Sequence, residues 1–260
     1  MENTQPTKID TFTWDNLKAD GPHTHISVME LFLQSVAQPS LEAVERKLDE
    51  IRSSVDPLAG FEMIEYEPLY SSTLQGYFLV VQSIWERQLR GYLIACALEL
   101  GWVSKDILLL KKDTWERLQA QFLKLRGIAL SEFESFQDLH LLHLLGNACR
   151  HGDGDSAKQI FSAYPGLWAN WPPTRPEWWD GPPLKDIPTH PSFEQVTLPH
   201  ALLKQMVQSV IWFWEDYDYI YTNSIKSKHH TVPRTLGKMR QNRAERVRVW
   251  SASAPLADTA

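Results

Sequence analysis

Apolar residues recur at helical spacing along most of this chain, and hardly any segment shows the strict alternation of a strand. After a polar, irregular start over residues 1–22, this pattern predicts helices over residues 24–37, 40–54, 71–101, 105–126 and 198–224. Residues 56–68 are expected to be a connection, and Gly127 is expected to end the fourth helix. The sequence therefore predicts an all-α fold.

Another helix is expected to follow the capping box Ser131-x-x-Glu134 and to stop at Gly152. Asp155 or Ser156 can then cap a short helix that runs to about residue 164. The helix before Gly152 has an unusual polar side. His140, His143, Asn147, Arg150 and His151 fall within an arc of about 100°, and the opposite side is apolar. Such a polar edge is expected to face a cleft or a partner subunit.

Residues 164–196 differ in composition from the rest of the chain. They hold eight of the sixteen prolines and four of the eleven tryptophans. This proline density excludes regular structure, while so many aromatic side chains argue against simple disorder. We expect an ordered irregular insertion that packs across the helices as a lid, or alternatively stacks nucleobases.

The segment Asn147-Ala-Cys-Arg-His151-Gly152 resembles the N-x-x-x-H-G motif of the HEPN superfamily, a group of helical proteins in bacterial toxins and phage-defence systems. Residues 77–93, an apolar run that carries Glu86, are similar to the first core helix of that superfamily. The resemblance covers about residues 70–165 and implies a HEPN-like helical bundle. It also implies a homodimer that acts on RNA in a defence or toxin–antitoxin system, with or without a partner protein.

One residue of the family pattern is missing. HEPN ribonucleases carry an Arg before the motif Asn, and in this chain the corresponding position is Gly146. Arg150 or His143 can be considered as its substitute. Because Arg150 and His151 are adjacent, their side chains diverge by about 100° on an ideal helix.

Two chemical roles follow for these residues. In metal-independent RNA cleavage, His151 would move protons, Arg150 or His143 would contact the phosphate, Asn147 would orient it, and Glu86 would fix an Arg or His. Such a reaction needs no cofactor. The alternative is a non-catalytic protein that binds a partner or nucleic acid, with the polar edge making only structural hydrogen bonds. A metal site at His140 and His143 has no firmly placed third ligand.

Charge is unevenly distributed along the 260 residues, whose net charge is −6. The tail over residues 226–260 holds eight basic residues against Glu245 and Asp258. This tail is expected to meet nucleic acid or to fold against an acidic face. The nucleic-acid candidates within it are Lys238, Arg240, Arg243, Arg246 and Arg248.

The remaining features concern the domain organisation, the absence of an expected membrane span and the state of the cysteines. Residues 1–225 are expected to form one helical domain, which 198–224 closes, ahead of the basic tail. The most apolar stretch contains Glu86, Arg87 and Arg90, so it predicts a buried helix and not a membrane span. Cys96 and Cys149 both lie in apolar helical contexts, which favours a reduced cytoplasmic protein.

Overall fold

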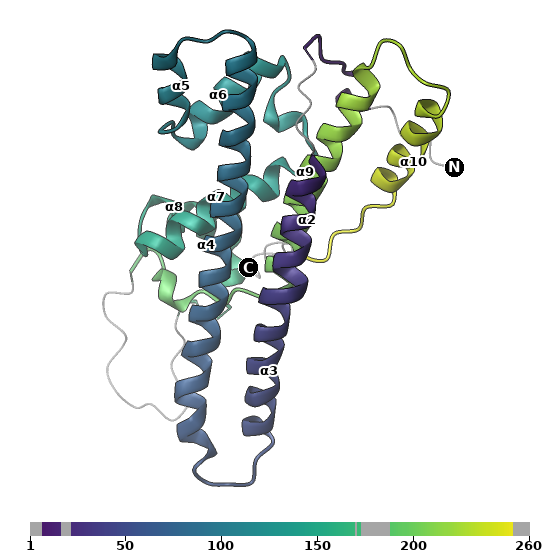
Figure 1. Ribbon diagram of the computed structural model, residues 1–260. Helices are drawn as coiled ribbons and strands as arrows, with labels where there is room; N and C mark the ends of the chain where they lie inside the picture. Colours follow the sequence, from purple (N-terminus) through teal and green to yellow (C-terminus); the bar gives the residue numbers. More distant parts are fainter. Residues whose placement is uncertain (1–6, 17–21, 170, 173–187, 252–260) are drawn as a thin grey trace, which may run out of the picture.

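The protein is an all-α molecule, as the sequence predicts. The computed structural model describes residues 7–16, 22–169, 171–172 and 188–251. Helices make up 74% of it, and the described residues form no strand. The long helix α4 (Ala59–Glu99) is the central element, and it packs against α3, α5, α6, α7 and α9 (Figure 1). No helix in the described ranges is long and apolar enough to cross a membrane.

The first half of the chain forms a long helical hairpin. Helix α2 (Pro22–Phe32), a π-helical segment (Leu33–Ala37) and α3 (Gln38–Arg52) follow one another without interruption. The expected break between residues 37 and 40 is therefore wrong. Pro39 lies in the first turn of α3, and the wider π-helical turn just before it lets the helix continue.

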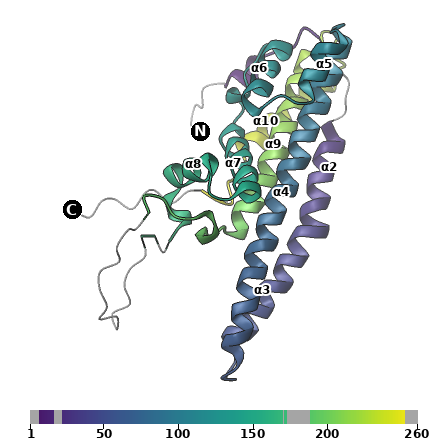
Figure 2. The same cartoon turned by 90° about the vertical axis from the view of Figure 1, so that its left-hand side faces the viewer.

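The expected connection over residues 56–68 is also wrong in extent, because α4 already begins at Ala59 and Pro68 lies within it. Proline removes one helical hydrogen bond, but the turns around it pack along α3. The hydroxyl of Tyr70 donates to Glu45 of α3 at 2.6 Å. Helix α3 and the first half of α4 extend beyond the other helices in both views (Figures 1 and 2), and we call them the arm.

Aromatic side chains from α4, α6 and α9 fill the centre of the body. Trp85 meets Phe213 edge to face at 4.7 Å between ring centroids, and Tyr92 meets Tyr217 at 4.9 Å. The indole N–H of buried Trp214 donates to Gln88 at 2.8 Å. Pairs of this geometry add about 0.5–1.5 kcal/mol each to the free energy of burial, so they join the three helices firmly.

The segment predicted as one helix over residues 105–126 is two helices, α5 (Ser104–Leu110) and α6 (Trp115–Arg126). Thr114 caps α6 by accepting from the backbone N–H of Arg117. Arg90 of α4 donates to the carbonyl oxygens of Leu110 and Asp113, at 2.8 and 2.7 Å. These bonds satisfy carbonyl groups that a continuous helix would use. Gly127, with φ of 71°, ends α6 as predicted.

Helix α7 (Phe136–His151) carries the polar stripe and ends at Gly152, whose φ is 68°. The expected capping box is wrong, because Leu130–Glu132 form a 3-10 turn and α7 starts only after Ser135. The short helix α8 (Asp155–Ala163) follows as predicted.

The chain then enters the Trp/Pro-rich insertion. Its described ends hold two 3-10 turns, Pro165–Leu167 and Phe193–Gln195. Trp168 is buried, donates to the carbonyl of Ser192 at 3.0 Å and packs against Phe161, which agrees with the expected lid at this end. Trp178 and Trp179 lie outside the described residues.

Helix α9 (His200–Ser224) closes the core, close to the predicted bounds. The basic tail continues into α10 (Val232–Ala244), which packs against α9, and residues 245–251 follow it. At the other end of the chain, the single-turn helix α1 (Lys8–Thr11) also contacts α9.

Candidate functional site

The polar stripe of α7 lies largely against α4 and α6. The indole N–H of Trp115 in α6 donates to Nδ1 of His140 at 3.2 Å. The same indole stacks on His143, with centroids 5.4 Å apart and an interplanar angle of 18°. Asn147 Nδ2 lies 3.0 Å from His143 Nε2. Two of the three stripe histidines therefore contact one buried tryptophan.

His143 is placed to remain neutral. Burial lowers the pKa of His143, and the carboxylates of Glu86 and Glu116 only partly oppose that effect. A neutral ring can accept a hydrogen bond from the Asn147 amide through Nε2. This pair is suited to holding α7 in position, since the ring of His143 is covered by Trp115.

Glu86 on α4 is held by its own helix. It accepts from the Gln82 amide at 2.6 Å and forms an ion pair with Arg90. Gln82 in turn accepts from Nη2 of Arg150 at 3.3 Å. Gln82 and Arg90 were not predicted as site residues. The signal for them was the spacing of residues 82, 86 and 90, which puts three polar side chains on one face of a helix.

The position of the missing motif Arg is a close contact between α4 and α7. A Cβ atom added at Gly146 would lie 2.7 Å from Cγ and 3.0 Å from Cβ of Gln82. Real Cβ atoms do not approach other atoms so closely, so only glycine fits while the helices keep this distance. The close packing of α4 on α7 therefore excludes an arginine at this position.

His151 stands apart from the other predicted residues. It is exposed at the last turn of α7 and has no hydrogen-bond or ion-pair partner among the described residues. The following turn is fixed, because Asp153 accepts from the Ser192 hydroxyl at 3.2 Å and from the Phe193 backbone N–H at 2.5 Å. The structure thus links His143 to Asn147, and Arg150 to Glu86 through Gln82, and leaves His151 facing solvent.

Against protein-family models, curated proteins and solved structures, this chain gives no match. The resemblance to HEPN proteins therefore rests on the motif residues and their placement on α7. Burial raises the pKa of the thiol of Cys149, which lies within the motif, to about 12, and a thiol that stays protonated is a poor nucleophile. Within the described ranges, no three His, Cys, Asp or Glu side chains are grouped to hold a metal ion.

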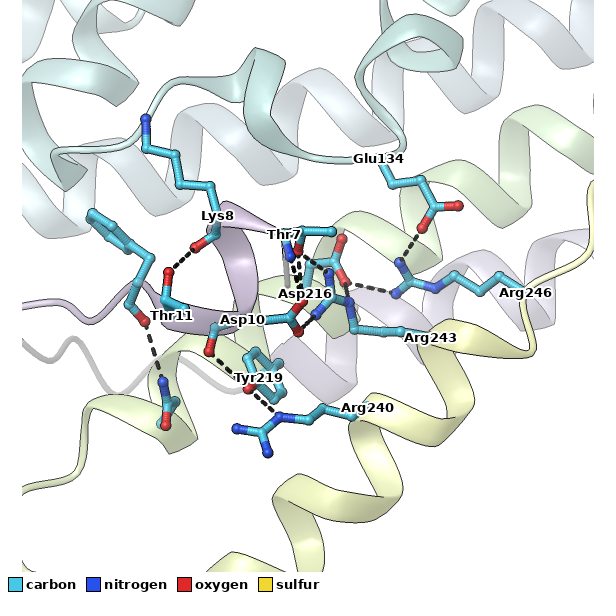
Figure 3. A network of polar contacts seen from close by, with 12 residues as sticks. Thr7, Lys8, Asp10, Thr11, Glu134, Asp216, Tyr219, Arg240, Arg243 and Arg246 are labelled. Carbon is cyan, nitrogen blue, oxygen red and sulfur yellow. Dashed lines mark hydrogen bonds and ion pairs between the residues drawn. The ribbon is translucent and has the colours of Figure 1, made fainter. Parts of the chain in front are cut away.

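The five basic residues predicted to contact nucleic acid fall into two groups. Arg243 forms ion pairs with Asp10 at 2.6 Å and with Asp216 at 2.9 Å (Figure 3). Arg246 pairs with the same Asp216 at 2.9 Å and reaches Glu215 and Glu134 at 3.0 and 3.3 Å.

Further along, Arg248 forms an ion pair with Asp138 of α7. The last part of the tail therefore folds against an acidic face, which is one of the two outcomes that its charge predicted. Asp216 is fully buried, and only 3% of the Arg246 side chain is exposed. Burial by itself lowers the pKa of Arg246, but Asp216 and Glu215 raise it above its usual value.

The other basic residues lie at the surface. We call Lys226, Lys228, Arg234, Lys238 and Arg240 the basic surface. All five are exposed, and none forms an ion pair with a described residue. Arg240 donates to the Tyr219 hydroxyl at 2.8 Å, which holds it on α9. No aspartate or glutamate occurs between residues 219 and 244, so this positive charge is not neutralised locally.

Proposed function

We propose that this protein is a HEPN-like RNA-binding protein that holds RNA through the basic surface. The observation that carries the proposal is a set of exposed cations that form no ion pair with a described residue, in a 26-residue segment without a carboxylate. Cations on one surface displace counterions from a phosphate backbone, and this release drives nucleic-acid binding. RNA is the polyanion that the resemblance to HEPN proteins implies.

The division among the arginines supports this assignment. Arg243 and Arg246 hold α10 on the body, while Lys238 and Arg240 of the same helix stay exposed and form no ion pair with a described residue. The remainder of the chain carries a net negative charge, which favours phosphate binding at the basic surface. We further propose that the protein is cytoplasmic and acts with a partner protein of a defence or toxin–antitoxin system.

Neutralising the basic surface tests RNA binding directly. Replacing Lys226, Lys228, Arg234 and Lys238 by Gln is expected to weaken binding of a short fluorescent single-stranded RNA about tenfold or more. Each lost phosphate contact removes about 0.7 from the slope of log affinity against log salt, so the slope should fall by about 3. Fluorescence anisotropy over a salt series measures both quantities.

The matched control removes four exposed basic residues elsewhere, by changing Arg46, Arg87, Arg117 and Lys158 to Gln. This control should change the affinity little. Equal losses in both variants would mean that only net charge matters, and the assignment of the surface would be rejected.

A second candidate function is RNA cleavage, and the exposure of His151 beside exposed Arg150 favours it. In this reaction the ribose 2′-hydroxyl attacks the adjacent phosphorus, and the bond to the 5′-oxygen breaks. A cyclic phosphate and a 5′-hydroxyl are formed. His151 would move the proton near neutral pH, and Arg150 would stabilise the charge on the phosphate. His143 is less suited than Arg150 to contact the phosphate, because burial lowers its pKa and Trp115 stacks on its ring.

His151→Ala separates the two functions. The variant should keep its unfolding free energy within about 0.5 kcal/mol, since the exposed side chain that is removed has no partner among the described residues. If the protein is a nuclease, a denaturing gel of bacterial RNA incubated in EDTA should show cleavage by the wild type and none by the variant. Intact RNA in both lanes, with RNA affinity retained, would leave binding as the function.

A further inference from the structure

The free end of the arm exposes apolar side chains to solvent. Phe61, Ile64 and Leu58 are 68%, 70% and 64% exposed, and Val55 in the turn is fully exposed. Phe61, Ile64 and Pro68 follow one another at helical spacing, so the outer side of the first turns of α4 is apolar. Contiguous apolar patches of this kind usually mark interaction sites. We call Val55, Leu58, Phe61 and Ile64 the tip patch.

The charge around the tip patch is negative. Residues 49–67 contain six carboxylates and one basic residue, Arg52. Arg52 is already paired with Asp49 and Glu67, and Glu62 is paired with Lys47. Glu50, Asp56 and Glu65 have no ion pair with a described residue. A partner for this surface must therefore offer both apolar and positive groups.

The opposite end of α4 has those properties. Leu98, Leu100, Val103, Leu108 and Leu109 are 42–64% exposed at the end of α4 and in α5, and we call them the end patch. Residues 98–112 hold three lysines, Lys105, Lys111 and Lys112, against Glu99 and Asp106, and the lysines are exposed and form no ion pair with a described residue. The two patches are alike in being apolar and opposite in charge.

We propose that the tip patch of one copy docks on the end patch of a second copy, in a head-to-tail contact. The 41 residues of α4 separate the patches by about 60 Å at 1.5 Å per residue, so one chain cannot bring its own two patches together (Figures 1 and 2). Tip-to-tip pairing would instead bring two sets of carboxylates together, which costs free energy.

A head-to-tail contact differs from a symmetric dimer in what it leaves unused. In a pair of copies, one tip patch and one end patch remain free, so further copies can add to form a chain, or the two ends can close into a ring. Four or five large apolar side chains on each partner correspond to about 500 Å² per copy, which lies at the small end of specific interfaces. The contact should therefore be reversible, strengthen with protein concentration, and weaken several-fold between about 0.05 and 0.5 M salt.

Two interface variants and one control test the proposal by light scattering over a concentration series. The tip variant carries Phe61→Asn and Ile64→Asn, and the end variant carries Leu108→Asn and Leu109→Asn. The control changes the exposed Val28 and Leu31 of α2 to Asn. Circular dichroism verifies that all three keep their helix content. The wild type and the control should grow beyond the 30.0 kDa of one chain, and either interface variant alone should need at least tenfold higher concentration to do so.

Mixing the two interface variants gives the decisive result. The tip variant retains an intact end patch and the end variant an intact tip patch, so an equimolar mixture should form complexes of two chains and no larger. A wild type of one-chain mass at every concentration would overturn the proposal. So would an end variant that associates like the wild type, or a mixture that stays monomeric. RNA affinity should be unchanged in both variants, which separates this test from that of the basic surface.

Discussion

Asp216→Asn is expected to destabilise the protein by about 3–5 kcal/mol. The buried carboxylate of Asp216 lies 2.9 Å from Arg243 and 2.9 Å from Arg246, on α10 and just after it. Removing its charge takes from two largely buried guanidinium groups the buried carboxylate that they share and leaves each with more exposed partners only. Breaking a buried ion pair costs far more than losing a surface pair. Urea unfolding followed by circular dichroism measures the loss.

Glu134→Gln is the matched control for this prediction. Glu134 pairs with the same Arg246 at 3.3 Å, but 53% of its side chain is exposed. Solvent screening limits such a pair to about 0–1 kcal/mol, so the control should unfold almost like the wild type. Similar losses of unfolding free energy in Asp216→Asn and Glu134→Gln would show that the burial of Asp216 does not determine the size of the loss.

Proteolysis gives an independent reading of the same variant. The tail is held by Arg243, Arg246 and Arg248, and the first two depend on Asp216. Asp216→Asn should therefore expose α10 to trypsin before the rest of the molecule unfolds, because local opening precedes global unfolding where contacts are fewest. Equal cleavage rates for the wild type and the variant would show that these ion pairs do not hold α10 on the body.

The second large effect is expected for Gly146→Arg, the change that would restore the HEPN motif. The free energy of unfolding of this variant should fall by about 3 kcal/mol or more, or the variant should fail to fold. The reason is that even a Cβ atom at this position would lie 2.7 Å from the Gln82 side chain. Gly146→Ala should also destabilise, by about 1–3 kcal/mol, although alanine is the better helix former. Thermal and urea unfolding measure both variants.

Gly91→Ala is the internal control, since Gly91 also lies within a helix, and a Cβ atom there would meet nothing within 4 Å. It should stabilise the protein by up to about 1 kcal/mol through helix propensity alone. A stable Gly146→Arg variant would show that α4 and α7 can separate, and would make the motif compatible with this fold.

Local chemistry was sufficient to predict several helix ends. Gly127 and Gly152 adopt positive φ, so each signal acts within a few residues of the boundary that it sets. Boundaries that depend on distant residues were missed. The break before α6 uses Arg90, and the helix through Pro68 is supported by packing on α3, neither of which a local pattern contains.

The candidate site shows the same division. The sequence placed His143, Asn147, Arg150 and His151 on one stripe, because helical spacing fixes their angles. It could not tell that Trp115 covers His143 while His151 faces solvent. That difference depends on where α6 crosses α7, which is a property of the packed helices.

By itself, the sequence determined the all-α class, the main helices and the uneven charge, since these follow from periodicity and composition. Only the tertiary structure decided which charges are available. Arg243, Arg246 and Arg248 are used internally because Asp10, Asp216 and Asp138 come to them from other parts of the chain. Lys226, Lys228, Arg234 and Lys238 remain exposed because no described carboxylate reaches them. The pairing of charges depends on distances in space, and a linear pattern of residues does not contain those distances.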